Sequence, residues 1–310
     1  DSYFSEGEGF FRFASSLQAL ARYDDIDKSL DAEALAFYFS FHAVVPPPWT
    51  ILKGVRKLPP ATLMRIEPDG QRSTRQYWDI HFGAKKDERN YSYADWKDLI
   101  HVELRQAVKR RLVADVDVGV LLSGGLDSSL IVGLLHEAGQ KGLNTFSIGF
   151  ESVGEEKGDE FEYSDIVARH FDTHHTQIQI DTSRTLTELD NAIAQMSEPM
   201  TSHDCIGFYL LSEEVSKRVK VVQSGQGADE VFAGYHWYPP MLDTNDAVGA
   251  YAKAFFDRDR AEMGDLLKDR WMTRKDLPRQ FVEAHFTKGG AERPIDQALR
   301  LDTQVMLADD

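Results

Sequence analysis

The sequence predicts an α/β domain built on a parallel sheet over residues 94–310 of the 310-residue chain. Apolar runs typical of strands alternate there with patterns typical of helices, and the runs are continuously apolar. Such strands are typical of a parallel sheet that helices cover on both faces. The predicted strands are 116–122, 145–150, 175–180 and 219–224, and the helices between them are 128–138, 163–171 and 208–218. Glycine-rich turns follow the first and last strands, at the edge where open α/β sheets bind ligands.

An amphipathic helix leads into this domain. Its apolar residues recur at helical spacing and are Trp96, Leu99, Ile100, Leu104, Val108 and Leu112. The polar stretch at 83–93 before it is interpreted as a linker. The last part of the chain, residues 241–310, also has a helical pattern.

Residues 1–82 have a different pattern and predict a small α+β region. A strand at 10–14 is followed by a helix at 31–39 with a capping aspartate and by a hairpin at 61–78 with an Asp-Gly turn. The prolines at 46–48 require an extended loop, because proline fits neither a helix interior nor a strand ladder. No complete core is evident in this stretch, so we interpret it as the end of a larger domain.

The composition argues against several classes of protein. Hydrophobic residues make up 42% and charged residues 28% of the sequence, and the formal net charge is −16. This charge disfavours a general nucleic-acid or membrane-surface binder, because phosphate groups must be met by lysine and arginine. No apolar run approaches the roughly 18–20 residues of a membrane-spanning helix. The single cysteine, Cys205, excludes a disulfide framework within the chain and favours a cytoplasmic location.

The turn after the first strand, Ser123-Gly-Gly-Leu-Asp-Ser-Ser129, has the residues that a phosphate site needs. Gly124 and Gly125 let the backbone approach an anion closely, and the following helix offers free N–H groups and the positive end of its dipole. The hydroxyl donors are Ser123, Ser128 and Ser129. Asp127 would repel phosphate on its own, so we expect it to bind Mg²⁺ that also contacts pyrophosphate oxygens.

This string resembles the signature of the ATP pyrophosphatases, which cleave ATP between its α and β phosphates to adenylate a substrate. A second string, Ser224-Gly-Gln-Gly-Ala-Asp-Glu-Val-Phe-Ala-Gly-Tyr235, is similar to a motif of the asparagine synthetases. The resemblance implies that ATP and Mg²⁺ are used and that Asp229 joins Asp127 on the metal. The implied nucleotide-binding residues are Leu121, Leu122, Ser123, Gly124, Gly125, Asp127, Ser128, Ser129, Ile148, Ser224 and Gly225.

The implied catalytic acids are Asp127, Asp229 and Glu230. For Asp229 and Glu230 the alternative interpretation is a pair of solvated acids at the start of a helix, where the dipole favours them. For the aliphatic residues Leu121, Leu122 and Ile148, which would flank adenine, the alternative is ordinary core packing.

Residues 1–82 resemble the end of the glutaminase domain of the same family, through strings at 11–17, 45–60 and 76–78. Family glutaminases use an N-terminal cysteine as nucleophile, whereas this chain begins with Asp1. We therefore interpret the chain as part of a longer protein. It would hold the end of an N-terminal-nucleophile glutaminase domain at 1–82 and a synthetase domain at 94–310 that is shortened at its C-terminus.

Gln226 departs from the asparagine synthetases, which place a glutamate there, close to the acyl adenylate. A neutral amide cannot accept a proton from attacking ammonia. Either another acid such as Glu230 or Glu198 takes this role, or the acceptor is not free aspartate. We favour a branch with another acceptor, the N-acetylglutaminylglutamine amide synthases. The strings that resemble that branch lie at 41–46, 197–204 and 224–240.

We therefore expect an ATP-dependent amide synthetase that acts on a small-molecule carboxylate with ammonia, drawn from glutamine in the full-length protein. The alternatives are aspartate-to-asparagine synthesis, a non-catalytic nucleotide-binding fragment, and a cyclase in which an internal amine attacks the adenylate. A homodimer is left open. A tRNA sulfurtransferase would need Cys205 as sulfur carrier, and the acidic composition disfavours it.

Two further features are interpreted structurally. His174 and His175 are adjacent on a predicted strand, so their side chains point to opposite faces and do not readily share one metal ion. The aromatic cluster at 235–238 is interpreted as packing, with the lining of an acceptor pocket as the alternative.

Overall fold

The computed structural model describes residues 2–83, 88–150, 161–200 and 204–309. Its contacts divide the chain into two compact units. The first unit comprises Asp1–Gly83, Met196–Thr201 and Asp229–Asp310, and the second comprises Ala84–Gln195 and Ser202–Ala228.

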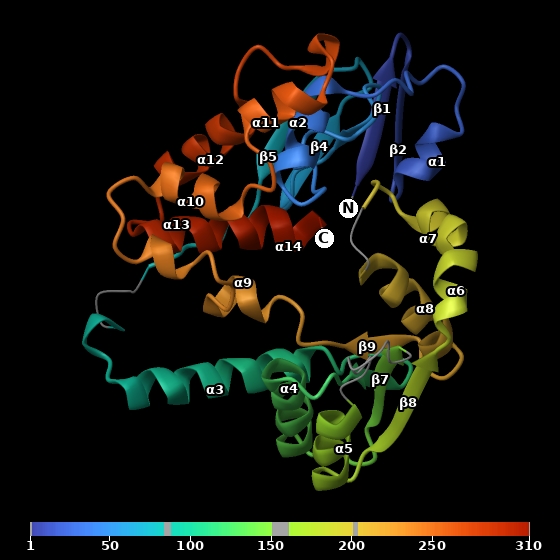
Figure 1. Cartoon of the computed structure of the whole chain (residues 1–310), viewed down its shortest axis with the longest axis vertical. Helices are drawn as coiled ribbons and strands as arrows, with labels where there is room; N and C mark the ends of the chain where they lie inside the picture. The colour runs from blue at the N-terminus through green and yellow to red at the C-terminus, as the bar shows by residue number, and fades with distance from the viewer. Residues whose placement is uncertain (1, 84–87, 151–160, 201–203, 310) are drawn as a thin grey trace. The chain divides into compact units, whose positions relative to one another are not determined.

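The second unit contains a four-stranded sheet in the order β8-β7-β6-β9, in which every pairing is parallel (Figure 1). Its strands are β6 (Val118–Leu121), β7 (Asn144–Phe150), β8 (His174–Ile180) and β9 (Val221–Gln223). β7 and β8 extend the sheet on one side of β6, whereas β9 lies on the other side. The strand order therefore reverses between β6 and β9. The predicted parallel sheet is confirmed, with strand ends shifted by one or two residues.

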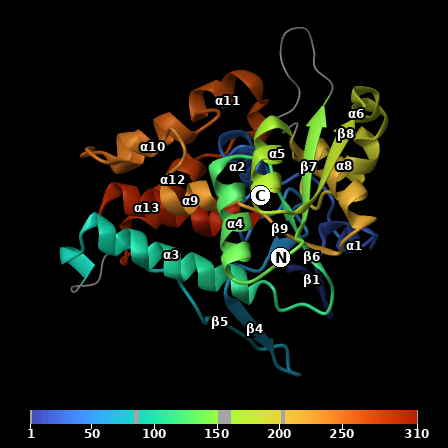
Figure 2. The same cartoon turned by 90° about the horizontal axis from the view of Figure 1, so that it is seen from below.

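Helices cover both faces of this sheet, as Figure 2 shows for α4 and α5 on one side of β7 and α8 on the other. The helices of this unit are η1 (Glu88–Asn90), α3 (Tyr93–Arg110), α4 (Leu126–Glu137), α5 (Phe161–His170), α6 (Thr182–Thr187), α7 (Leu189–Gln195) and α8 (Asp204–Ser216). One apolar cluster packs Val120 and Leu122 with residues of α3, α4 and α5. The other packs Phe146 against Leu211 and Val215 of α8.

Local chemistry explains where two of these helices begin. Ser92 and Asp95 form a capping box at the start of α3, where each side chain accepts a hydrogen bond from the other residue's backbone N–H. α4 begins at Leu126, two residues before the predicted start, because Gly125 takes the N-cap position in an extended conformation. Glycine is one of the residues accepted at an N-cap.

The first unit begins with an antiparallel sheet in the order β2-β1-β3 and a separate hairpin. Its strands are β1 (Tyr3–Gly7), β2 (Phe10–Ala14), β3 (Arg56–Lys57), β4 (Thr62–Ile66) and β5 (Arg72–Gln76), with helices α1 (Leu17–Ala21) and α2 (Ala32–Ser40). Asp31 caps α2 by accepting a hydrogen bond from the Glu33 N–H at 2.9 Å. The predicted strand at 10–14, the capped helix and the hairpin are confirmed.

The rest of the first unit is helical, as predicted for residues 241–310. Its elements are α9 (Ala228–Phe232), η2 (Pro239–Met241), α10 (Ala247–Phe255), α11 (Arg260–Leu266), η3 (Asp269–Trp271), α12 (Leu277–Thr287), α13 (Pro294–Leu301), the π-helical turn η4 (Asp302–Met306) and α14 (Leu307–Asp309). Within the described part of the chain, no helix has both the length and the apolar character to cross a membrane.

Residues 1–82 contain a buried apolar cluster that the sequence pattern did not indicate. A buried cluster is drawn from this stretch alone, namely Tyr3, Leu17, Leu20, Ile26, Ala34, Val45, Ile51 and Val55. Several of its members lie outside regular helices and strands, so no periodic pattern marked them.

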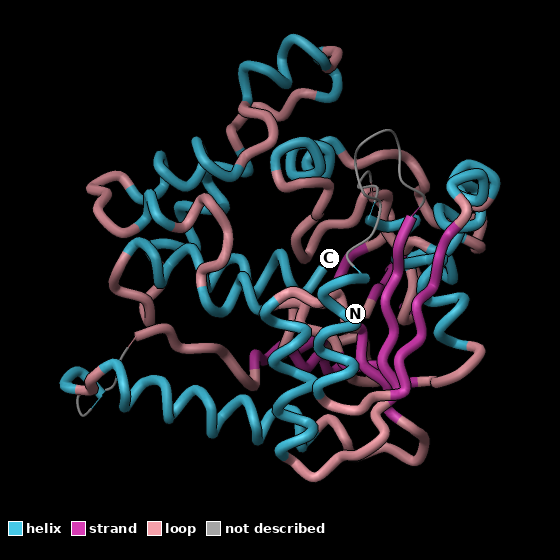
Figure 3. The backbone as a smooth tube through the Cα atoms, turned by 60° about the horizontal axis from the view of Figure 1, so that its bottom comes forward, coloured by secondary structure: helices cyan, strands magenta, loops and turns pink. Residues whose placement is uncertain are grey.

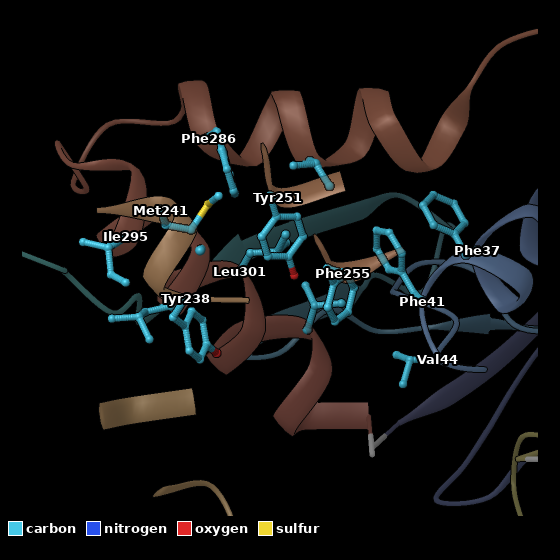
Figure 4. Close-up of a cluster of buried hydrophobic side chains, with 14 residues drawn as sticks. Phe37, Phe41, Val44, Tyr238, Met241, Tyr251, Phe255, Phe286, Ile295 and Leu301 are labelled. Atoms are coloured by element: carbon cyan, nitrogen blue, oxygen red, sulfur yellow. The ribbon is translucent and has the colours of Figure 1, made fainter. Parts of the chain in front are cut away.

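A second cluster of the first unit joins distant parts of the sequence. Phe37, Phe41 and Val44 pack with residues between 238 and 305, including Tyr238 and Tyr251 (Figure 4). The contacts thus group residues 229–310 with the N-terminal region, whereas the predicted domain boundaries place them with the parallel sheet. The domain boundaries at 82 and 94 were placed from the sequence alone, and they stay a prediction.

Candidate functional site

The phosphate loop, residues 123–129, leaves the carboxyl end of β6 and enters α4. Ser123 organises it through its hydroxyl, which accepts a hydrogen bond from the Gly125 N–H at 3.2 Å and lies 3.0 Å from the Ser128 hydroxyl. Ser128 also donates to the Gly125 carbonyl at 3.3 Å. Unlike α2 and α3, α4 has no side-chain cap among the described residues. Its first N–H groups are therefore suited to an anion.

Gly124 is required here for a reason that the sequence did not reveal. Its φ is +91°, and an added Cβ would lie 2.5 Å from the Ser164 nitrogen and 2.6 Å from the Tyr163 Cβ. The first turn of α5 is thus packed directly on the loop. A side chain at position 124 would both strain the backbone and displace that helix.

The second loop, residues 224–227, leaves the carboxyl end of β9. Since β9 pairs in parallel with β6, the two loops emerge side by side where the strand order reverses. The strands of the sheet are drawn in magenta in Figure 3. They are in contact: a Cβ on Gly225 would lie 2.8 Å from the Asp127 Cβ and 2.9 Å from the Ser128 nitrogen. The structure therefore brings together the two strings that the sequence singled out.

The polar groups at this contact are open to solvent. Ser123, Asp127, Ser224 and Gln226 are all exposed, and the Gln226 N–H donates to the Ser224 hydroxyl at 3.4 Å. Ser129 differs, because its hydroxyl oxygen is buried and has no hydrogen-bond partner among the described residues.

The three aliphatic candidates lie on two faces of the sheet. Leu121 and Ile148 are partly buried in the cluster beneath α8, whereas Leu122 is 1% exposed in the cluster beneath α4 and α5. Only Leu121 and Ile148 therefore share a face, and the contact of these residues with adenine stays a prediction.

Asp229 and Glu230 belong to α9 and are described within the first unit. Gly234 packs against Asp229, since a Cβ added to Gly234 would overlap the Asp229 carboxylate. Glu230 is 6% exposed, and its Oε1 accepts a hydrogen bond from the Tyr235 hydroxyl at 3.0 Å. Its Oε2 is buried without a hydrogen-bond partner in the described part of the chain. The interpretation of Glu230 as a solvated acid is wrong, because helix α9 turns it into the core.

Glu198, the other acid considered in place of Gln226, has a structural partner. Its Oε2 accepts a hydrogen bond from the Ile51 N–H at 3.1 Å, and its Oε1 lies 3.7 Å from the Lys57 ammonium nitrogen. Both side chains are buried, to 10% and 3% exposure. Glu198 thus balances the charge of a buried lysine, which makes it a poor candidate for a proton acceptor.

Sequence reasoning missed the polar centre of the first unit, which we call the Asp302 cluster. The Asp302 carboxylate accepts hydrogen bonds from the Tyr238 hydroxyl at 2.6 Å, the Trp237 indole N–H at 3.1 Å and the Tyr251 hydroxyl. Burial raises the pKa of Asp302 to about 6. Tyr238 and Tyr251 are fully buried in the aromatic core, where Figure 4 shows their oxygens, so packing is the role that the structure supports for this part of 235–238.

The described part of the chain holds no group of three or more His, Cys, Asp or Glu side chains suited to an ion. His203, a neighbour of Cys205 in sequence, lies outside the described residues. Asp127 and Asp229 are two carboxylates in separate units, and their shared metal stays a prediction.

A parallel sheet with two glycine-containing loops in contact at the reversal of strand order defines an α/β protein of the nucleotide-binding type. The family model for asparagine synthase matches residues 100–310, and that for a glutamine amidotransferase domain matches residues 2–78. The chain belongs to the asparagine synthase family.

Curated relatives agree with this assignment. The chain is 33% identical to asparagine synthetase [glutamine-hydrolyzing] 1 of Bacillus subtilis over 74% of its length and 35% of that protein. It is 28% identical to asparagine synthetase 3 of the same species, over 94% and 47%. A putative asparagine synthetase of Methanocaldococcus jannaschii is 34% identical, over 75% and 44%. The chain therefore spans less than half the length of each of these relatives.

Among solved structures, the chain is similar to an NH3-dependent NAD synthetase from Campylobacter jejuni, with 19% identity and a TM-score of 0.32. That similarity covers 46% of this chain and 61% of the other.

Proposed function

We propose that the chain is the ATP-using part of an amidotransferase, which adenylates a carboxylate and passes the acyl group to ammonia. The observation that carries the proposal is the contact between Gly225 and the first turn of α4. It places two polar, solvent-open loops at the strand-order reversal, where sheets of this type bind nucleotides. The match of residues 100–310 to the asparagine synthase family supports the same function.

In the first step, a carboxylate oxygen of the acceptor attacks the α phosphorus of ATP. The bond from that phosphorus to the bridging oxygen breaks, and pyrophosphate leaves. The N–H groups at the uncapped start of α4 and the exposed hydroxyl of Ser123 would hold the phosphates. Asp127 and Asp229 would hold Mg²⁺, which neutralises charge on the pyrophosphate when bound.

In the second step, ammonia attacks the acyl carbon, the carbon–oxygen bond to AMP breaks, and the nitrogen loses a proton. A group that accepts this proton must be a base, which the amide of Gln226 is not. Glu230 is the acid that we propose for this role, and although it is 6% exposed, its Oε2 has no hydrogen-bond partner among the described residues. Glu198 is already engaged with Lys57.

The acceptor that we favour is N-acetylglutaminylglutamine. The support is the neutral, exposed Gln226 where the asparagine synthetases have glutamate, together with the strings noted above. Aspartate is the second candidate, because the curated relatives are named asparagine synthetases. In the longer protein, residues 2–78 would belong to the domain that releases ammonia from glutamine.

The test is AMP formation from ATP and Mg²⁺ with ammonium and either acceptor, together with carboxylate-dependent exchange of pyrophosphate into ATP. We expect activity with the acetylated dipeptide and its loss in Asp127→Ala. Asp190→Ala is the matched control, because Asp190 is likewise exposed in the first turn of a helix, α7. Unchanged exchange in Asp127→Ala would contradict the proposal. Binding of ATP by calorimetry without AMP formation with either acceptor would favour a non-catalytic fragment.

A further inference from the structure

A line of polar side chains crosses the sheet face beneath α4 and α5, beside the apolar cluster that holds Val120 and Leu122. Thr145 and Ser147 of β7 are 0% and 4% exposed, and His175 of β8 lies beside them with a side chain 10% exposed. The ring nitrogens of His175 lie 2.8 Å from the Thr145 hydroxyl and 3.1 Å from the Ser147 hydroxyl. Its neighbour His174 is exposed.

The hydrogen-bond partners determine where the protons lie. The Ser147 hydroxyl is 2.6 Å from the Leu122 carbonyl, which can only accept, so Ser147 must donate its one proton there. Ser147 can then only accept from His175, which places a proton on Nε2. In a neutral ring Nδ1 is the acceptor and takes the Thr145 proton, and Thr145 in turn accepts from Thr173 at 2.8 Å.

The end of this line lies at the base of the phosphate loop. The ladder between β6 and β7 ends at the pair Leu121↔Phe146, and just beyond it both polar groups of Leu122 are held by β7. The Leu122 N–H donates to the Phe146 carbonyl at 2.8 Å, and its carbonyl accepts from the Ser147 side chain. These two bonds fix the peptide that leads into Ser123.

Burial favours the neutral form of His175. Burial lowers the pKa of His175, and Asp165 of α5, with Oδ1 3.9 Å from Nε2, opposes this in part. Asp165 is itself engaged by the Gln177 side-chain N–H at 2.8 Å. Protonation of His175 would add a donor only at Nδ1, and the Thr145 hydroxyl could then turn to accept from it. The Ser147 link to Leu122 does not depend on that change.

We propose that His175, with its proton on Nε2, is a positioning residue that orients the phosphate loop for ATP by holding the Ser147 hydroxyl on the Leu122 carbonyl. This inference rests on the proposed function only in naming ATP as the ligand. The geometry on which it depends lies entirely within the second unit.

The experiment measures the dissociation constant for ATP·Mg²⁺ by calorimetry in matched variants of the full chain. Ser147→Ala and His175→Asn are expected to weaken ATP binding by roughly two- to tenfold, the equivalent of one lost hydrogen bond. His175→Gln is expected to restore binding, because its amide N–H can take the place of Nε2. The controls are the exposed His174→Asn and Ser216→Ala, since the Ser216 hydroxyl also donates to a carbonyl, that of Glu213 at 2.8 Å, but on α8.

Equal ATP affinity in wild type, Ser147→Ala and His175→Asn would overturn the proposal, as would a failure of His175→Gln to differ from His175→Asn. If these variants do not fold, the tautomer of His175 in the wild-type chain decides, read by NMR with ¹⁵N-labelled histidine. A proton on Nδ1 alone would overturn the inference, and a proton on Nε2 supports it.

A second readout separates this inference from the proposed function. If the wild-type chain does not bind ATP, the proposed function fails, and amide hydrogen exchange at Ser123–Gly125 tests the positioning by itself. Faster exchange there in Ser147→Ala, with unchanged exchange in α8, supports it. Unchanged exchange in the loop would overturn it.

Discussion

The phosphate loop of the second unit and the Asp302 cluster of the first unit are both polar sites, and they are built in opposite ways. The loop is a short run of sequence in which small residues allow close packing, with Ser123 and Asp127 left open to solvent. The Asp302 cluster joins residues 237, 238, 251 and 302, and its acid and both tyrosines are closed to solvent, with their distances set by the packing of segments far apart in sequence. The comparison teaches that a closely packed loop depends on the absence of side chains at its glycines, whereas a buried acid depends on the presence of its donors.

The largest expected effect is at the buried acid. Asp302→Ala leaves the two buried tyrosine hydroxyls and the partly buried Trp237 N–H without an acceptor and opens a cavity, so we expect a loss of about 3–5 kcal/mol in the free energy of unfolding. Urea unfolding, with hydrogen exchange to locate the loss in the first unit, measures it. The control is the exposed Asp243→Ala. A loss below about 1 kcal/mol, the range of a surface substitution, would show that the donors find other partners.

The next effect tests the loop. Gly124→Ala combines a positive φ with a contact of 2.5 Å, so we expect a loss of about 2–4 kcal/mol from strain and overpacking together. Gly139 has nearly the same φ, +92°, but nothing within 4 Å of an added Cβ. Gly139→Ala therefore isolates the strain, with an expected loss of about 1 kcal/mol. Equal losses in the two variants would show that α5 can move away from position 124 without a cost in the free energy of unfolding.

The pH dependence of stability sharpens the comparison further. Because burial raises the pKa of Asp302 from 3.8 to about 6, the folded state binds this proton more tightly than the unfolded state. The resulting stabilisation is complete below about pH 4 and is lost as the pH rises through about 6. The unfolding free energy of the wild type minus that of Asp302→Asn should therefore fall by at most about 3 kcal/mol as the pH rises from 4 to 7. A difference that is constant over this range, measured by urea unfolding with Asp243→Asn as control, would show that Asp302 titrates normally.

The smallest change in stability is expected at Gly225, where the effect appears in binding. An added Cβ would press on Asp127 and Ser128 at 2.8–2.9 Å, so the second loop must shift away from α4. We expect Gly225→Ala to weaken ATP binding roughly tenfold, about 1.4 kcal/mol, as measured by calorimetry. Gly289→Ala, where nothing lies within 4 Å of the new Cβ, is the control. Wild-type affinity in Gly225→Ala would show that this contact does not shape the nucleotide site.

Much of the second unit could be predicted from the sequence, because its signals are local. Continuously apolar strands and glycine-containing turns can be recognised within about ten residues of sequence, and these signals predicted the parallel sheet and the adjacent loops. The start of α4 was predicted two residues late, because a glycine N-cap has no side-chain signature.

The remaining features depend on contacts between distant residues. The aromatic core brings Phe37 and Phe41 against residues beyond 238, and Asp302 meets Tyr238 across 64 positions. His175 was considered only as a metal ligand, because its partners Thr145 and Ser147 lie on a different strand. In each case tertiary packing determines the partner, and the residue pattern of a single segment does not predict it.

The pairing of β9 with β6 has a consequence for how the protein is made. It joins Val118 to Val221, so it encloses a segment of about a hundred residues and is a contact of high sequence separation. A growing chain that has reached only β8 has the first loop but lacks the strand that carries the second. The two loops are therefore brought together only after β7, β8 and α8 have been synthesised, and the proposed nucleotide site is incomplete until then.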